Sequence, residues 1–141
     1  MINICYICTG NTCRSIMAER LMKKLLKDNG IKDVKVSSKG VCAKKENITL
    51  QAKNTLKKLK ASSGDRKSIK LGKVKKDVLY IVMTENLKNY VNADKVITIK
   101  QLLGYDIQDP YGQDEDVYMQ VAQDLIKANQ VILEKILMWR K

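Results

Sequence analysis

The residues best suited to carry out a chemical reaction lie in one short loop near the start of this 141-residue chain. Cys8 and Arg14 bound the loop, and the residues around them are small or polar. The full loop reads Cys8, Thr9, Gly10, Asn11, Thr12, Cys13, Arg14 and Ser15. A cysteine thiolate is a strong nucleophile, and an arginine guanidinium binds two phosphate oxygens through one planar fork. This combination predicts nucleophilic attack at a bound phosphate group.

The elements on either side of the loop should give it an anion-binding backbone. Apolar residues from Ile2 to Ile7 predict a buried strand, and apolar residues at helical spacing predict a helix from Ile16 to about Asn29. Unpaired backbone N–H groups and the helix dipole attract anions at such a strand-to-helix junction. We therefore expect the N–H groups from Thr9 to Arg14 to surround a phosphate, with Gly10 permitting the tight curvature. A helix N-terminus and a nearby arginine also favour the thiolate form of a cysteine.

Three loop residues have supporting roles to fill. Asn11 is expected to brace the loop through backbone hydrogen bonds. Ser15 can donate a hydrogen bond to the Cys8 thiolate or cap the helix, and one side chain cannot readily do both. Cys13 is either a buried spacer or a redox guard that forms a disulfide with Cys8 under peroxide. The sequence leaves both choices open.

A proton donor for the leaving group is needed as well. The chain contains no histidine, so an acidic side chain is the natural candidate. Asp109, followed by Pro110, lies in the loop after the fourth predicted strand. The carboxyl ends of parallel strands meet at one edge of a sheet, which would bring this carboxyl group towards Cys8. An ordinary Asp-Pro turn explains the same two residues equally well.

The remaining pattern alternates strands and helices. Further strands are predicted at Val34–Ser38, Val78–Met83 and Lys95–Ile99, further helices at Thr49–Lys60, Asn86–Asn92 and Asp116–Met138, and an irregular loop at Gln101–Gln113. This alternation predicts an α/β fold with three layers, in which helices cover both faces of a parallel sheet. The length fits one domain, residues 1–141.

The loop, continued by Met17-Ala18-Glu19, resembles the signature of the low-molecular-weight protein-tyrosine-phosphatase family. The resemblance extends along the chain through Ser38–Val41, Val82–Thr84 and Asp109-Pro110. It implies a four-stranded parallel sheet of the flavodoxin-like type, a phosphocysteine intermediate, and neither metal nor other cofactor. By the match, Cys8 is the nucleophile, Arg14 the phosphate clamp and Asp109 the general acid.

Two positions indicate a branch of that family. Thr12 stands where tyrosine-specific members usually carry an aliphatic residue, and Tyr111 is followed by Gly112 instead of a second aromatic residue. Both features resemble the protein-arginine phosphatases of Gram-positive bacteria. A polar, β-branched Thr12 narrows the pocket floor, and Tyr111 can stack on a guanidinium. Phosphoarginine is therefore the expected substrate, with phosphotyrosine as the alternative.

This sequence also departs from the family pattern. Ile16 replaces a usual proline, Lys39 replaces a small residue, and the frequent loop histidine has no counterpart. These changes bear on the support of the loop more than on the chemistry.

Three alternatives to the phosphatase hypothesis fit the sequence less well. An arsenate reductase of this fold needs resolving cysteines after the third strand, and residues 75–90 contain none. A metal site built from Cys5, Cys8, Cys13 and Cys42 is disfavoured because strand residues three apart face opposite ways. A non-enzymatic phosphocarrier or phosphate-binding module, in which Cys8 is phosphorylated and passes the phosphate on, would not need Arg14 and an acid.

Composition limits the partners. The net charge of +12 attracts phosphorylated proteins, but no nucleic-acid motif accompanies it. There is no long apolar run and no signal peptide at the N-terminus, so a cytoplasmic protein that contacts no membrane is expected. A monomer is expected, although the sequence does not determine the oligomeric state.

Overall fold

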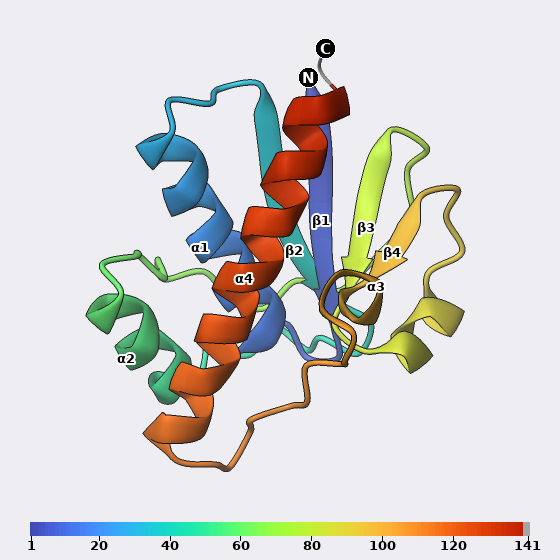
Figure 1. Cartoon of the computed structure of the whole chain (residues 1–141). Helices are drawn as coiled ribbons and strands as arrows, with labels where there is room; N and C mark the ends of the chain where they lie inside the picture. Colours follow the sequence, from blue (N-terminus) through green and yellow to red (C-terminus); the bar gives the residue numbers. More distant parts are fainter. Residues whose placement is uncertain (140–141) are drawn as a thin grey trace.

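A parallel four-stranded sheet forms the centre of the computed structural model (Figure 1). Its strands are β1 (Ile2–Cys8), β2 (Val34–Gly40), β3 (Val78–Val82) and β4 (Val96–Thr98). They lie in the order β2-β1-β3-β4, and every neighbouring pair is parallel. This confirms the predicted fold class. The structure describes residues 1–139, and residues 140 and 141 of the predicted domain lie outside the described residues.

Helices follow the strands and pack on them and on one another. They are α1 (Arg14–Asp28), α2 (Leu50–Lys58), the 3₁₀ helix η1 (Glu85–Tyr90), α3 (Ile99–Leu103) and α4 (Glu115–Trp139). The long helix α4 crosses the sheet beside α1, and α2 packs against both (Figure 1). Within residues 1–139, no helix has the length and apolar character needed to cross a membrane.

The strand order places the predicted phosphate loop, Cys8 to Ser15, where the strands that follow β1 switch from one side of it to the other. From β1 the chain passes to β2 on one side, and it later returns to β3 on the other side of β1. The crevice beyond the carboxyl ends of such central strands is the usual ligand site in open α/β sheets. The loop between β1 and α1 emerges into this crevice.

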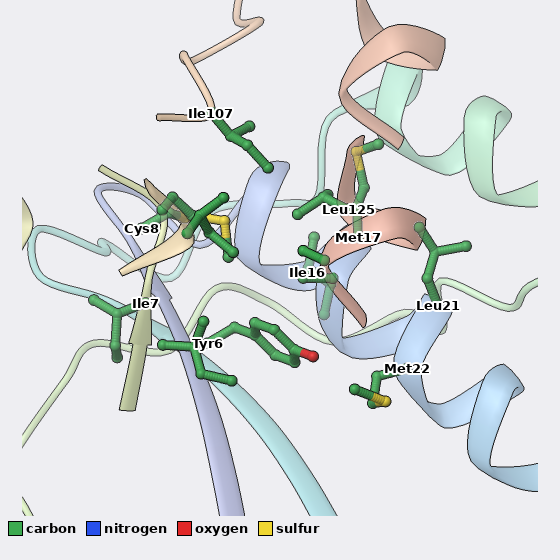
Figure 2. Packing of buried hydrophobic residues seen from close by; sticks show 14 of the residues in the cluster. Tyr6, Ile7, Cys8, Ile16, Met17, Leu21, Met22, Ile107 and Leu125 are labelled. Atoms are coloured by element: carbon green, nitrogen blue, oxygen red, sulfur yellow. The ribbon is translucent and has the colours of Figure 1, made fainter. Parts of the chain in front are cut away.

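Apolar packing fixes both ends of that loop. On β1, Tyr6 and Ile7 are completely buried, and on α1 Ile16 and Met17 are as well. Figure 2 shows these side chains in one cluster with Leu125 of α4. Each such side chain contributes about 1.5–3 kcal/mol by leaving water. The strand and the helix are therefore held firmly, and only the short loop between them can adjust.

The structure corrects the prediction for the region after β4. The irregular loop was expected from Gln101, but residues from Ile99 to Leu103 form a helix. Thr98 caps it, because its hydroxyl accepts from the Gln101 N–H and the Gln101 side chain accepts from the Thr98 N–H. Gly104 ends it in the left-handed conformation, with φ of 89°. The helix predicted at Asn86–Asn92 is also different, because it begins at Glu85 and is a 3₁₀ helix.

Candidate active site

The loop after β1 is curled and tied to its neighbours through its carbonyl groups. The bonds run from Val41 N–H to Cys8 O at 3.0 Å, from Cys42 N–H to Thr9 O at 2.8 Å and from Thr49 N–H to Thr12 O at 3.0 Å. All peptide bonds described are trans, so each N–H points away from the carbonyl of the same peptide. Carbonyls bound on the outer side therefore turn the N–H groups of the following residues towards the inner side of the loop, as an anion site requires.

Cys8 lies at the end of β1 with its side chain almost fully enclosed, at 1% exposure. Its sulfur accepts a hydrogen bond from the Asn11 N–H at 3.2 Å and lies 2.8 Å from Ser15 Oγ. The residue that caps α1 is Cys13, and no side chain forms a cap hydrogen bond there. Ser15 is thus inside the helix and contacts the Cys8 sulfur instead of capping α1, which agrees with the first of its two predicted roles.

Asn11 determines which way the Ser15 hydrogen points. Its amide Nδ2 donates to Ser15 Oγ at 2.7 Å and to Ser38 Oγ at 3.0 Å. Since Ser15 Oγ already accepts a hydrogen from Asn11, its own hydrogen is available for the Cys8 sulfur. Asn11 adopts a left-handed backbone conformation with φ of 56°. It was expected to brace the loop through backbone bonds, whereas most of its contacts are between side chains.

Arg14 begins α1, and its guanidinium spans the crevice. It donates to the Ile107 carbonyl at 3.0 Å and to Thr9 Oγ1 at 3.4 Å. The residue is only 4% exposed, yet its Nε is buried with no hydrogen-bond partner among residues 1–139. A buried unpaired donor costs about 1–3 kcal/mol. A phosphate oxygen held in the loop would remove that cost.

Asp109 lies at the rim of the loop and also forms the predicted turn. Its Oδ1 accepts from the Tyr111 N–H at 3.0 Å and from the Cys13 thiol at 3.5 Å. Burial, with the nearby Cys8 and Asp109 adding to it, raises the pKa of Cys13 to about 12. Cys13 therefore keeps its proton at neutral pH and can donate it. The structure brings Asp109 to the phosphate loop through this contact.

Comparison with known proteins identifies the family. The model of the low molecular weight phosphotyrosine protein phosphatase family matches residues 3–138. The chain belongs to this family. The crystal structure of the low molecular weight protein tyrosine phosphatase from T. tengcongensis shares the fold, with a TM-score of 0.85. Its sequence is 30% identical over 96% of this chain and 99% of that one.

Two further relatives represent different substrates within this phosphatase family. A mutant of the YwlE arginine phosphatase with a phosphorylated active-site serine has a TM-score of 0.82 and 28% identity, over 96% of this chain and 95% of that one. The low molecular weight protein-tyrosine-phosphatase PtpA of Staphylococcus aureus is 50% identical over 40 residues. That match spans 28% of this chain and only 26% of the length of PtpA.

The two residues predicted to set substrate choice differ in exposure. Thr12 is half-buried in the phosphate loop. Tyr111 is 71% exposed and lies two residues after Asp109, in the loop between α3 and α4. Gln113 N–H donates to Pro110 O at 2.9 Å, and Gly112 occupies a left-handed position with φ of 79°. This backbone conformation disfavours residues other than glycine at position 112, so Tyr111 is not followed by a second aromatic residue.

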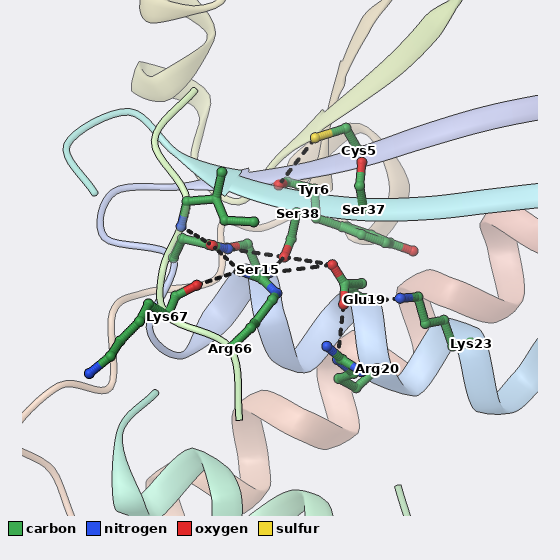
Figure 3. A network of polar contacts seen from close by, with 12 residues as sticks. Cys5, Tyr6, Ser15, Glu19, Arg20, Lys23, Ser37, Ser38, Arg66 and Lys67 are labelled. Carbon is green, nitrogen blue, oxygen red and sulfur yellow. Dashed lines mark hydrogen bonds and ion pairs between the residues drawn. The ribbon is translucent and has the colours of Figure 1, made fainter. Parts of the chain in front are cut away.

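A polar cluster under the loop was missed by the sequence analysis (Figure 3). Glu19 of α1 is nearly buried, and three cations contact its carboxylate: Arg20 at 2.9 Å, Lys23 at 3.4 Å and Arg66 at 3.4 Å. Ser38 of β2 also donates to Glu19, at 3.0 Å. Glu19 was noted only as part of the family signature, and Arg66 carries no local signal because its partners are distant in sequence.

Gly40 is the other residue whose role only the structure reveals. It ends β2 directly beneath the phosphate loop, and a Cβ there would lie 2.6 Å from Thr9 O and 2.8 Å from Asn11 N. Real Cβ atoms do not approach backbone so closely. A glycine is needed because the loop rests on this strand.

The four cysteines are free, with Cys5, Cys8 and Cys13 buried and Cys42 exposed. The Cys8–Cys13 disulfide therefore stays a prediction. Among residues 1–139 there is no group of three or more His, Cys, Asp or Glu side chains suited to a metal ion.

Proposed function

We propose that this chain hydrolyses phosphorylated side chains of proteins through a phosphocysteine intermediate, with phosphoarginine as the substrate. One observation carries the proposal. The enclosed Cys8 sulfur, which has hydrogen-bond donors on two sides, shares its loop with Arg14, whose buried Nε lacks a partner. A phosphate bound in the loop would satisfy that donor and meet the sulfur.

The proposed reaction has two steps that share one acid-base group. In the first, the Cys8 thiolate attacks phosphorus while the bond from phosphorus to the substrate nitrogen breaks, and Asp109 gives its proton to that nitrogen. In the second, the Asp109 carboxylate takes a proton from water as the water oxygen attacks phosphorus. The phosphorus–sulfur bond breaks, which releases phosphate and restores the thiolate. Arg14 and the loop N–H groups stabilise the charge on the equatorial oxygens in both steps.

The choice of phosphoarginine rests on two residues: Thr12 in the loop, and Tyr111, whose N–H donates to the Asp109 oxygen that Cys13 also contacts. Thr12 places a hydroxyl in the loop where an aliphatic side chain would suit a phenyl ring better. Tyr111 supplies a single aromatic face, and the left-handed backbone at Gly112 disfavours a second aromatic residue there. A guanidinium can stack on one ring and form hydrogen bonds with polar groups around it. Likeness to the YwlE arginine phosphatase adds support, while likeness to PtpA favours phosphotyrosine as the alternative.

Turnover of matched phosphoarginine and phosphotyrosine peptides tests the proposal. The wild-type protein should have the higher kcat/KM for phosphoarginine. Thr12→Ile should reduce the ratio of the two kcat/KM values by about 10- to 200-fold, the range that one pocket contact commonly gives. Thr12→Ser, which retains the hydroxyl, should keep the preference, and Cys8→Ser should release no phosphate from either peptide.

Two results would overturn parts of this assignment. A wild-type preference for phosphotyrosine, or an unchanged ratio in Thr12→Ile, would remove phosphoarginine as the substrate. Phosphate release by Cys8→Ser at the wild-type rate would remove the phosphocysteine mechanism.

A further inference from the structure

Arg66 lies on the long connection between α2 and β3, outside the phosphate loop, but its side chain reaches under that loop. The side chain is 22% exposed. Its NH1 donates to Asn11 Oδ1 at 3.0 Å, and its NH2 donates to Ser38 Oγ at 2.6 Å. NH2 also lies 3.4 Å from the buried carboxylate of Glu19. One guanidinium thus joins the phosphate loop, β2 and α1. Figure 3 shows Arg66 beside Ser38 of β2 and Glu19 of α1.

These contacts fix the orientation of the Asn11 amide. Its Oδ1 accepts from Arg66 and from the Ile69 N–H at 3.0 Å, both on the same connection. A flipped amide would turn its NH₂ group towards a cation and a second donor, which is unfavourable. Its NH₂ group must therefore face Ser15 and Ser38, as observed.

The orientation has a consequence at the nucleophile. Asn11 donates to Ser15, so Ser15 donates to Cys8. In this series of hydrogen bonds from Arg66 to the sulfur, every hydrogen points towards Cys8. A donor on sulfur favours the thiolate over the thiol. The guanidinium also places a permanent positive charge at the start of this series of hydrogen bonds, and the Glu19 carboxylate holds the guanidinium in place.

We propose that Arg66 is a positioning residue that favours the Cys8 thiolate by acting through Asn11 and Ser15. This inference rests on the proposed role of Cys8 as the nucleophile. The fork geometry is essential, because the two donors of Arg66 hold Asn11 and Ser38 at once. A lysine would supply the charge to Glu19 but could not reproduce the fork.

The test compares Arg66→Met with Arg20→Met. Both remove a cation from Glu19, but Arg20 makes no recorded contact with Asn11 or Ser38 within the described residues. All variants carry Cys42→Ser, since Cys42 is the exposed cysteine that would also react. The measurement is the rate of Cys8 alkylation by iodoacetamide, followed by mass spectrometry at about pH 6 and about pH 10.

Arg66→Met should be alkylated about tenfold more slowly than its parent at the lower pH. Without Arg66, Asn11 no longer directs the Ser15 hydrogen to the sulfur, and a hydrogen bond to a charged group is commonly worth about that factor. At the higher pH, where a cysteine is mostly thiolate in either protein, the two rates should agree within about twofold. Arg20→Met should match its parent at both values. Arg66→Lys should give an intermediate rate at the lower pH, and it serves as the second variant if Arg66→Met does not fold.

The role of Arg66 would be overturned if Cys8 of Arg66→Met, or of Arg66→Lys where that variant is used, is alkylated as fast as in the parent at the lower pH. This holds whatever the thermal stability of the variant. An equal slowing in Arg20→Met would show that only the charge on Glu19 matters, which would also overturn it. Alkylation reports on Cys8 without any turnover. A slowed Arg66→Met in a protein that releases no phosphate would therefore refute the proposed function and leave the positioning role intact.

Discussion

Replacing Gly40 by alanine tests how closely the phosphate loop depends on the strand beneath it. The new methyl group would lie 2.6 Å from Thr9 O and 2.8 Å from both Asn11 N and Gly10 C. All three are backbone atoms of the loop, so no flexible side chain can move aside. Gly40 itself is held by hydrogen bonds from its N–H to Ile69 O and to its carbonyl from Leu71 N–H, each at 2.9 Å. The loop must therefore move by several tenths of an ångström.

The expected effect is larger on catalysis than on folding. Overpacking of this kind costs about 1–3 kcal/mol of stability. A displacement that approaches 1 Å at a reacting group can cost about 10²-fold in rate. We expect Gly40→Ala to remain folded at low temperature and to lose between about 10- and 100-fold in kcat/KM. The N–H of Asn11 would move first, and with it the hydrogen bond to the Cys8 sulfur.

The assay is phosphate release from a phosphoarginine peptide, with urea unfolding of the same samples. Gly72→Ala is the matched control, because nothing lies within 4 Å of its Cβ position and its φ is not in the left-handed region. That variant should keep full activity and gain up to about 1 kcal/mol of stability. A folded Gly40→Ala protein with kcat/KM within about threefold of wild type would refute the reasoning.

Two further predictions concern the buried groups of the site. Inorganic phosphate should raise the stability of the wild type by about 2.7 kcal/mol at a hundredfold excess over its Kd, measured as a shift in Tm, and Arg14→Met should lose most of this gain. An equal gain in Arg14→Met would refute the assignment of its unpaired Nε to phosphate. The pKa of Cys13 is raised from 9.0 to about 12 on folding, so below about pH 9 both states keep the proton, whereas above it only the unfolded chain releases one. The free energy of unfolding should therefore fall as pH rises from about 9 to 12. Urea unfolding of Cys13→Ala should show a shallower fall with pH. Identical slopes of unfolding free energy against pH in the two proteins would contradict the raised pKa.

Local signals in the sequence predicted most of the elements. The apolar run from Ile2 and the helical spacing after Ile16 gave β1 and α1 to within two residues, since each element buries a face whose period is visible in the sequence. The missed helix α3 also had a local signal. Thr98 with Gln101 is a capping box, and Gly104 is a stop residue, but the short length of the helix hid its apolar period.

Roles that depend on distant contacts were not predictable in the same way. Whether Ser15 caps a helix or contacts Cys8 depends on where α1 begins, and the sequence allows either. Arg66 lies 55 residues from Asn11, on a polar stretch that reads as an ordinary loop. Ile16 and the absence of histidine depart from the family pattern in the residues that support the loop, and Arg66 provides contacts there.

The sequence by itself determined which reactive groups are available: a thiol at the end of β1, a guanidinium at the start of α1 and a carboxyl group in the loop after α3. It also determined the βα alternation that makes the strands parallel. It could do so because backbone periodicity and residue type are local properties. The tertiary structure decided how those groups are used, through the direction of the hydrogen bonds from Arg66 to Cys8, the closeness of Gly40 to the loop, and the meeting of Cys13 with Asp109. These depend on distances between segments far apart in the chain, which are set only when the core packs.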